Sequence, residues 1–234
     1  MNKSWFLPPL HPAGWPFIGI AALVAVFLSF FGGVALLIGL LLVVAVALFF
    51  RDPVRMTPTR AGLIISPADG RIVAISQVTP DKDLGLGDET HTRISIFLSV
   101  LDVHINRSPV DGEVVDAHYR AGKFFNAALD KASVDNERNA LALTMEGEHP
   151  FKGRKVGVVQ IAGLIARRII CTAAIGTKLK AGERFGLIRF GSRTDVYLPQ
   201  GIAICVVVGQ RAVGGETVLA DCQSVEKQRE GEVR

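Results

Sequence analysis

The chain has 234 residues, a formal net charge of +4 and a mean hydropathy of +0.35, and its length suits one globular domain plus an additional segment. The hydropathy is high for a soluble protein, and the excess is concentrated near the N-terminus. Three cysteines, Cys171, Cys205 and Cys222, show no CxxC or other metal-ligand spacing, which argues against a disulfide framework or a zinc site and indicates reduced thiols in a reducing compartment.

A stretch without any ionisable side chain runs from Pro16 to Phe50, after a short N-terminal segment of residues 1–15. A bilayer core takes roughly 20 helical residues to cross, so this stretch is too long for one untilted span and barely long enough for two. The Gly32-Gly33 pair divides it into two short arms. We expect a membrane-associated helical hairpin over 16–50, either two short spans or a re-entrant wedge, with one long tilted span as the alternative. A cleaved signal peptide fits poorly, because the run exceeds a signal's apolar core and no small-residue cleavage site follows.

Three arginines, Arg51, Arg55 and Arg60, follow the apolar stretch, whereas the residues before it carry only Lys3 and His11. Basic residues that flank an apolar segment favour the cytoplasmic face. The bias predicts that residues 51–234 lie on the cytoplasmic side of the cell (inner) membrane, where a basic surface is attracted to anionic headgroups.

After residue 51 the sequence changes to short runs that are rich in β-branched residues and separated by glycine, as is typical of strands. We expect strands within 62–66, 70–76, 92–100, 112–119, 155–163, 166–174, 185–190, 195–199 and 202–210. Tight turns are expected at 67–70, 109–112 and 180–183, with Gly70, Gly112 and Gly182 at positive φ. The predicted fold of residues 51–234 is mainly β, a sandwich or barrel of many short strands. A polar loop over 122–138 interrupts the pattern, and a loop of this length often shapes a binding site.

The dipeptide Gly191-Ser192 lies between Arg189 and Arg193 in the segment RFGSRTDVYLP. A serine hydroxyl can attack the carbonyl carbon of the preceding residue and convert the amide into an ester, an N-to-O acyl shift. Glycine at the preceding position leaves that carbonyl uncrowded and permits unusual φ and ψ, and a strained turn, an oxyanion donor and a base would favour the attack. The dipeptide alone is equally compatible with an ordinary turn.

The sequence around this dipeptide resembles the phosphatidylserine decarboxylase proenzymes, specifically their short, membrane-associated bacterial form. The resemblance is carried by four blocks in the same order and covers essentially the whole chain. These blocks are ISPADGRIV at 65–73, FLSVLDVHINRSPVDGEV at 97–114, GKFFNAALDKASVDNERN at 122–139 and FGSRTDVYLP at 190–199.

The resemblance implies that the chain cuts itself between Gly191 and Ser192 into a β chain (1–191) and an α chain (192–234), which stay together as a heterodimer that can assemble into a higher homo-oligomer. Residue 192 then becomes a pyruvoyl group, the only cofactor, with no metal and no pyridoxal phosphate. The implied substrate is phosphatidylserine in the membrane, whose amine forms a Schiff base with the pyruvoyl group before carbon dioxide leaves. No nucleic-acid partner is expected.

The resemblance also implies roles for two further residues. His104 matches the family's catalytic histidine and would act as acid and base, and Asp69 matches the acidic residue used in self-cleavage. Arg107 stands where longer bacterial relatives have a second histidine, and a guanidinium cannot serve as a base, so the base for maturation stays open. Phe190 and Arg193 likewise replace the leucine and threonine of the longer form.

Further residues are candidates for substrate binding, because arginine offers bidentate donors to phosphate and carboxylate and the 122–138 loop is suited to line a pocket. These candidates are Arg107, Arg189, Arg193, Phe124 and Asn126. For each arginine a solvated surface position is the alternative, and for the phenylalanine a position in the core.

Two other functions remain open from the residues. One is a membrane-tethered adaptor or carrier module of the biotinyl or lipoyl type, although Lys178 and Lys180, the nearest candidates for modification, lack the flanking methionine of that motif. The other is the same decarboxylation of a different serine-headgroup lipid, such as archaetidylserine.

Overall fold

The structure, a computed structural model, describes residues 8–122, 136–163, 168–189 and 191–232. The chain divides into two compact units. We call Met1–Val54 together with Leu101–Val103 the helical unit, and Arg55–Val100 together with His104–Arg234 the β unit.

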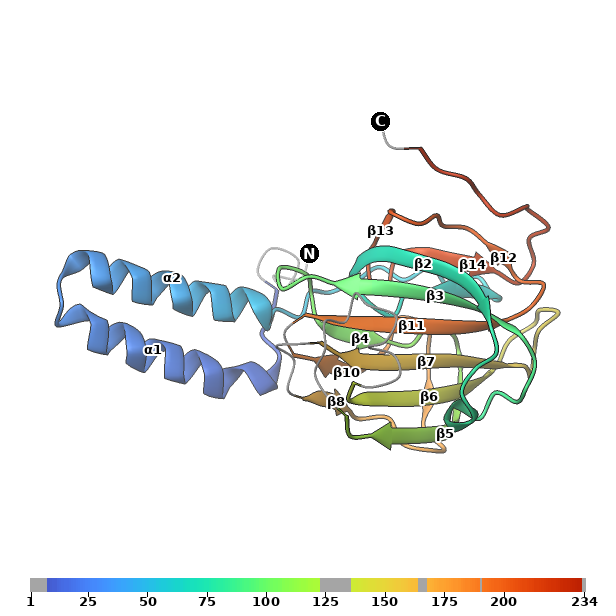
Figure 1. Ribbon diagram of the computed structural model, residues 1–234, viewed down its shortest axis with the longest axis horizontal. Helices are drawn as coiled ribbons and strands as arrows, with labels where there is room; N and C mark the ends of the chain where they lie inside the picture. Colours follow the sequence, from blue (N-terminus) through green and yellow to red (C-terminus); the bar gives the residue numbers. More distant parts are fainter. Residues whose placement is uncertain (1–7, 123–135, 164–167, 190, 233–234) are drawn as a thin grey trace. The chain divides into compact units, whose positions relative to one another are not determined.

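The helical unit contains two antiparallel helices, α1 (Trp15–Ser29) and α2 (Gly33–Phe49), after a short 3-10 helix η2 (Pro12–Gly14) (Figure 1). The expected helical hairpin is therefore confirmed. Gly32, with φ +107°, makes the reversal between the helices. The helices approach closely where Gly39 faces Ala25, since a Cβ on Gly39 would lie 2.5 Å from the Cα of Ala25. Small residues at such a contact are typical of helices packed within a membrane.

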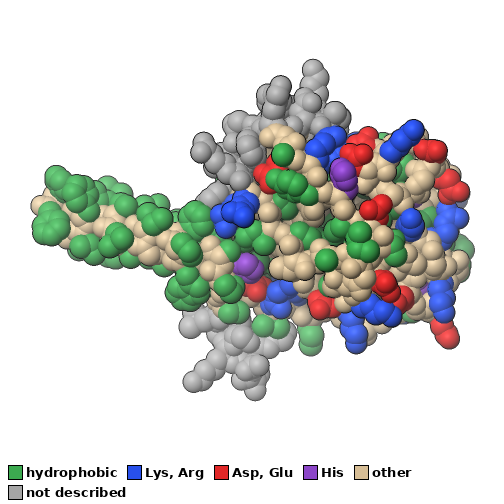
Figure 2. Space-filling view, turned by 90° about the horizontal axis from the view of Figure 1, so that it is seen from below, with side chains coloured by type: hydrophobic (Ala, Val, Ile, Leu, Met, Phe, Trp, Pro, Cys, Tyr) green, Lys and Arg blue, Asp and Glu red, His purple; other side chains and the backbone are tan. Residues whose placement is uncertain are grey.

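The open end of the hairpin is closed by backbone contacts between its two flanks. His11 N donates to Phe50 O at 2.8 Å and Asp52 N donates to Pro9 O at 2.7 Å. The rings of Phe17 and Phe50 stack with centroids 5.3 Å apart. Away from this closure, the helices are covered almost entirely by hydrophobic side chains (Figure 2), and Pro12–Ser29 is long and apolar enough to cross a membrane.

The β unit is built on one large antiparallel sheet of eight strands in the order β13-β2-β3-β11-β7-β6-β5-β9 (Figure 1). Its strands are β2 (Gly70–Val78), β3 (His91–Leu98), β5 (Gly112–Arg120), β6 (Arg138–Met145), β7 (Lys155–Ala162), β9 (Lys178–Leu179), β11 (Ser192–Pro199) and β13 (Arg211–Ala212). Two three-stranded sheets accompany it, in the orders β1-β14-β12 and β4-β10-β8. Their strands are β1 (Leu63–Ile65), β4 (Ile105–Arg107), β8 (Ile169–Cys171), β10 (Arg184–Ile188), β12 (Ala203–Ile204) and β14 (Val218–Asp221), and a 3-10 helix η3 (Lys82–Leu84) lies between β2 and β3.

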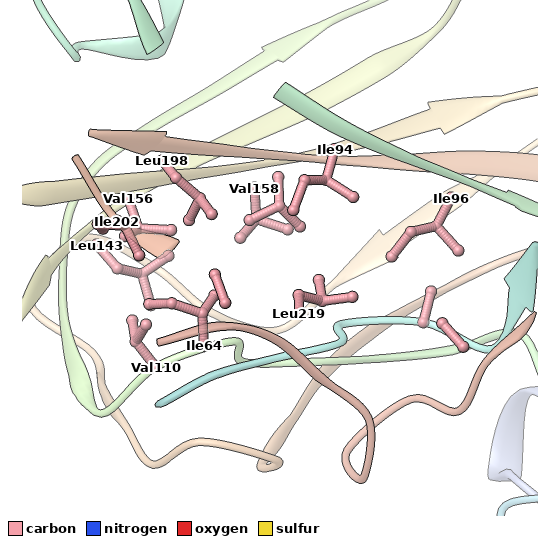
Figure 3. Packing of buried hydrophobic residues seen from close by; sticks show 14 of the residues in the cluster. Ile64, Ile94, Ile96, Val110, Leu143, Val156, Val158, Leu198, Ile202 and Leu219 are labelled. Atoms are coloured by element: carbon pink, nitrogen blue, oxygen red, sulfur yellow. The ribbon is translucent and has the colours of Figure 1, made fainter. Parts of the chain in front are cut away.

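The hydrophobic core lies between the large sheet and a small one. Figure 3 shows Ile94 of β3, Val158 of β7 and Leu198 of β11 directed toward Ile64 of β1 and Leu219 of β14, and all five belong to one cluster of buried residues. Packed layers of this kind confirm the predicted mainly β architecture.

The local predictions differ from the structure in several places, and the short strands β4, β9, β13 and β14 lie outside the ranges expected for strands. The strand β6 was not expected, because alanine and asparagine in Arg138–Met145 have low strand propensity, but it pairs with β5 and β7 and is buried. Of the expected strand at 202–210, only Ala203–Ile204 forms one. The turn prediction is wrong for Gly112, which is not at positive φ, whereas Gly70 and Gly182 are. Gly112 lies instead against the carbonyl oxygen of Thr144, only 2.4 Å from where a Cβ would stand.

Candidate active site

Ser192 is the first residue of β11, a central strand of the large sheet, and pairs with Leu98 of β3 and Ala162 of β7. Because side chains alternate along a strand, Ser192 shares its face with Val196 and Leu198, which belong to the core. Its side chain is fully buried, and its Oγ has no hydrogen-bond partner among the described residues. A buried hydroxyl without a partner costs about 1–3 kcal/mol, and such groups in native proteins often mark a site of chemistry.

Gly191 precedes this serine in a left-handed conformation, with φ +62°. A Cβ at this position would meet no atom within 4 Å, so the backbone conformation, not lack of space, favours glycine here. The N–H of Gly191 donates to Nε2 of His104 at 3.4 Å. One ring nitrogen of His104 therefore lies against the Gly191-Ser192 segment.

His104 lies directly before β4 and is fully buried. The structure thus brings together three residues that the sequence predicts for the site. His104 comes directly before β4, and Gly191 and Ser192 lie where β11 begins. His104 and Gly191 are 87 residues apart in the chain, so only the packing of β4 and β10 against the large sheet makes them neighbours.

A chain of buried amides and a hydroxyl connects the strands that carry these residues. Asn106 of β4 donates to Oγ1 of Thr194 in β11 at 3.1 Å, two residues beyond His104 and Ser192 respectively. Gln160 of β7 donates to Oδ1 of Asn106 at 2.8 Å and accepts from Asn139 of β6 at 3.0 Å. We call these four residues (Asn106, Thr194, Gln160 and Asn139) the amide network. Satisfied buried networks rigidify their surroundings, so this one holds β4 at a defined distance from β11. The sequence did not predict this network, because its four residues are far apart in the chain and form no spacing pattern.

Asp69 lies in the turn that precedes β2 and is buried. Its Oδ2 accepts a hydrogen bond from Arg55 at 2.6 Å, and its Oδ1 accepts one from the N–H of Gly214, also at 2.6 Å. Arg71 and Arg193 both pair with Phe97 of β3, on its two sides. The turn that holds Asp69 therefore lies at the same end of the sheet as Ser192, with β3 between them.

The three arginines considered for substrate binding differ in burial. Arg193 is only 2% exposed and forms a bidentate ion pair with Asp195, with both contacts at 2.7 Å. Arg107 is 5% exposed and donates to Gly182 O at 2.9 Å. These two side chains make internal contacts, which favour a structural role. Arg189 is only half-buried and so differs from both.

Arg189 faces a second arginine, Arg168, that sequence reasoning did not single out. Ile188 of β10 pairs with Ile169 of β8, and one step further Arg189 N donates to Arg168 O at 3.3 Å. Burial, and then the positive charge of Arg168, lower the pKa of Arg189. Like charges opposite each other on neighbouring strands are unfavourable, so this pair is well suited to bind an anion.

Phe124 and Asn126 lie outside the described residues, as does Phe190. Within the described ranges, no group of three or more His, Cys, Asp or Glu side chains is placed to hold a metal ion.

The chain is similar over most of its length to a known family and to named proteins of several bacteria. Residues 43–220 match the family described as phosphatidylserine decarboxylase. A protein of Cereibacter sphaeroides named phosphatidylserine decarboxylase proenzyme is 53% identical over 231 residues, 99% of this chain and 97% of the relative. Proteins with the same name from Ruegeria pomeroyi (53% over 221 residues, 94% of this chain and 99% of the relative) and Granulibacter bethesdensis (55% over 218 residues, 92% and 86%) are also similar.

Proposed function

Because the chain belongs to the phosphatidylserine decarboxylase family, we propose that it is a proenzyme that cuts itself between Gly191 and Ser192 and then converts phosphatidylserine to phosphatidylethanolamine and carbon dioxide. The observation that carries this proposal is the buried Ser192 hydroxyl, which has no partner within the described ranges and follows a left-handed glycine bound to His104.

Self-cleavage begins when Oγ of Ser192 attacks the carbonyl carbon of Gly191. The Oγ proton passes to a base, a C–O bond forms, and the C–N bond breaks as the nitrogen takes up a proton. The resulting ester is cleaved by β-elimination, in which the Cα proton of residue 192 is removed and the Cβ–O bond breaks. Gly191 leaves as a carboxylate, and tautomerisation and hydrolysis of the remaining dehydroalanine release ammonia and give the pyruvoyl group.

We assign the base to His104. Its Nε2 accepts from Gly191 N, which is only two bonds from the carbonyl carbon under attack, and a neutral imidazole can take up a proton near neutral pH. The amide network supports this assignment, because it joins β4 to β11 beside both residues. Asp69 has a supporting role in maturation, since Arg55 and Gly214 fix its carboxylate in the turn that precedes β2.

The two chains stay together after the cut because the α chain is woven into the sheets. Strand β11 pairs along its length with β3 and over most of it with β7, and β14 pairs with β1. All of these partner strands belong to the β chain. Cutting one peptide bond at the start of β11 breaks none of these pairings, so a stable heterodimer follows.

In the mature enzyme, a pyruvoyl carbonyl at position 192 supplies an electron sink for the pair released when carbon dioxide leaves. The chain's own residues bind and orient the lipid around it. The buried position of residue 192 keeps water away, and His104 is placed to return a proton to the product. We assign the anionic headgroup to Arg189 and Arg168, whose two positive charges an anion would neutralise. The helical unit anchors the enzyme in the inner membrane, with the β unit on the cytoplasmic side.

The cut is tested by the masses of the purified full-length protein and of its Ser192→Ala variant. The unaltered protein should separate into two chains on a denaturing gel, the smaller one blocked at its N-terminus and lighter than a serine-terminated fragment. Ser192→Ala should remain one chain of 25.2 kDa and release no carbon dioxide. Turnover by an uncut chain, or by Ser192→Ala, would refute the proposal.

The headgroup assignment is tested with Arg189→Gln, and with Arg184→Gln as control, an exposed arginine on the same β10 region. Loss of a charge-assisted hydrogen bond costs about 1.5–3 kcal/mol, so Arg189→Gln should raise KM for phosphatidylserine about tenfold or more while the precursor still cuts itself. An unchanged KM, or an equal change in the control, would contradict the assignment. Archaetidylserine as a second substrate distinguishes the two lipid classes.

A further inference from the structure

The connection between β3 and β4 contains an apolar turn at Val100 and Leu101. These two residues are 49% and 83% exposed. Turn positions ordinarily favour glycine, proline, asparagine, aspartate and serine. Single exposed apolar residues are common on any protein, but among the described residues outside the α1–α2 hairpin and its connection these are the only two large apolar neighbours that are both exposed.

Leu101 contacts an arginine that belongs, like Leu101 itself, to the helical unit. The guanidinium of Arg51 donates through Nη1 to Leu48 O in the last turn of α2, at 2.6 Å, and through Nη2 to Leu101 O at 2.7 Å. Accordingly, Leu101–Val103 belong to the helical unit. The tip of the turn and the end of the apolar helix are thus each one hydrogen bond from the same charged group.

Arg51 indicates where the surface of a bilayer would lie on this unit. An arginine at the end of an apolar helix places its charged head at the interface and its stem against the hydrocarbon. Trp15, 59% exposed at the first residue of α1, is at the same end of the hairpin, and tryptophan prefers the interface. An exposed leucine beside Arg51 is therefore at the depth where headgroups give way to acyl chains.

The apolar exposure is confined to the tip. The next two residues, Asp102 and Val103, are each 5% exposed, and His104 follows with none. Only two side chains project, and the chain then returns directly to the buried histidine that we assign as the base.

We infer that the Val100–Leu101 turn is a third membrane contact of this chain, which inserts into the headgroup–acyl boundary of the leaflet that holds α1 and α2. The inference rests on the membrane attachment proposed above. Its consequence is that Leu101–Val103, the part of the helical unit that precedes His104 in the chain, is held at the lipid surface.

Insertion is tested by fluorescence with Leu101→Trp in the full-length protein, reconstituted into phosphatidylcholine vesicles with and without brominated acyl chains. The matched control is Ile175→Trp, a 64% exposed isoleucine in a turn of the β unit. After subtraction of the native tryptophan signal, the fluorescence added at position 101 should be quenched and that added at position 175 should not. Equal quenching at the two positions, or none at position 101, would overturn the inference.

Its importance for turnover is tested with Leu101→Asp and the control Ile175→Asp, each assayed for carbon dioxide release. The substrates are phosphatidylserine in phosphatidylcholine vesicles and a short-chain phosphatidylserine below its micelle concentration. Removing one leucine side chain from the acyl-chain region shifts the equilibrium between the inserted and the withdrawn turn about tenfold or more. Leu101→Asp should therefore release carbon dioxide about tenfold more slowly from vesicles and at the unaltered rate from the soluble lipid. The control should keep both rates.

The remaining outcomes are distinguishable. A loss on both substrates, or no loss on vesicles, would overturn the inference. A change of oligomeric state in Leu101→Asp, together with an absence of quenching in Leu101→Trp, would show that the turn contacts a second copy of the chain. If the unaltered protein releases no carbon dioxide from either lipid, the proposed decarboxylation fails, whereas the quenching experiment still decides the membrane contact.

Discussion

Replacement of Gly191 by alanine perturbs the cleavage site by a single methyl group. Because the added Cβ would meet no atom within 4 Å, the change introduces no clash. Its whole effect is on the backbone, since Gly191 has φ +62° and the left-handed region is open to glycine but costly for other residues.

The cost of a left-handed alanine is about 1–2 kcal/mol. If self-cleavage proceeds from the conformation in which Gly191 N contacts His104, this cost lowers the fraction of precursor in that conformation. The decrease that corresponds to the cost is about 5- to 30-fold. Gly191→Ala should therefore cut about 5- to 30-fold more slowly than the unaltered precursor. Gly191→Asn should fall between the two, because asparagine tolerates this region better.

The rate is measured by following labelled precursor from cell-free synthesis on denaturing gels over time. Gly209→Ala is the control, since Gly209 also has positive φ (+92°) and open space around its Cβ position but lies in a turn apart from the site. It should show a comparable loss of stability and normal cleavage. Cleavage of Gly191→Ala at the normal rate would refute the reasoning. Faster cleavage would show instead that strain at this residue drives the reaction.

Three further predictions concern the rest of the chain. Asp195→Asn breaks a buried ion pair with Arg193 and should lower the free energy of unfolding by about 3–5 kcal/mol, measured by denaturant titration; replacing both residues by leucine should restore most of it. Burial raises the pKa of Cys222 to about 12, so the folded state keeps a proton that the unfolded thiol loses above about pH 8.5. Stability should be complete below that pH and decline above it toward pH 12, and melting temperatures of Cys222→Ala should fall less over that range; an identical decline would contradict this. Gly39→Val should separate α1 from α2 and accelerate amide exchange in both, whereas Gly19→Val, with nothing within 4 Å, should not.

Much of the architecture was predictable from local patterns in the sequence. The Gly32-Gly33 pair in an apolar stretch indicated a hairpin, and short runs of β-branched residues separated by glycine indicated strands. Strand β6 was missed because its alanines and asparagine suit a strand only when strands on both sides bury them. Gly112 was assigned the wrong conformation because its glycine is required by a neighbouring carbonyl oxygen, not by a turn.

The sequence by itself determined the chemistry that is available. It contains a glycine directly before a serine, a histidine within one of the four blocks that resemble the family, and an apolar stretch followed by three arginines. These are properties of neighbouring residues, and neighbouring residues are read directly from the chain.

Only the tertiary structure decided which side chains can act. Pairing of β11 with β3 and β7 buries Ser192, and alternation along the same strand turns Arg193 to the opposite face, against Asp195. The approach of β4 brings His104 to Gly191 across 87 residues, and the β8–β10 pairing sets Arg168 opposite Arg189. The burial of a side chain, the register of its strand and the face of the sheet on which it lies are set by contacts between distant segments. Neither local spacing nor composition reveals them.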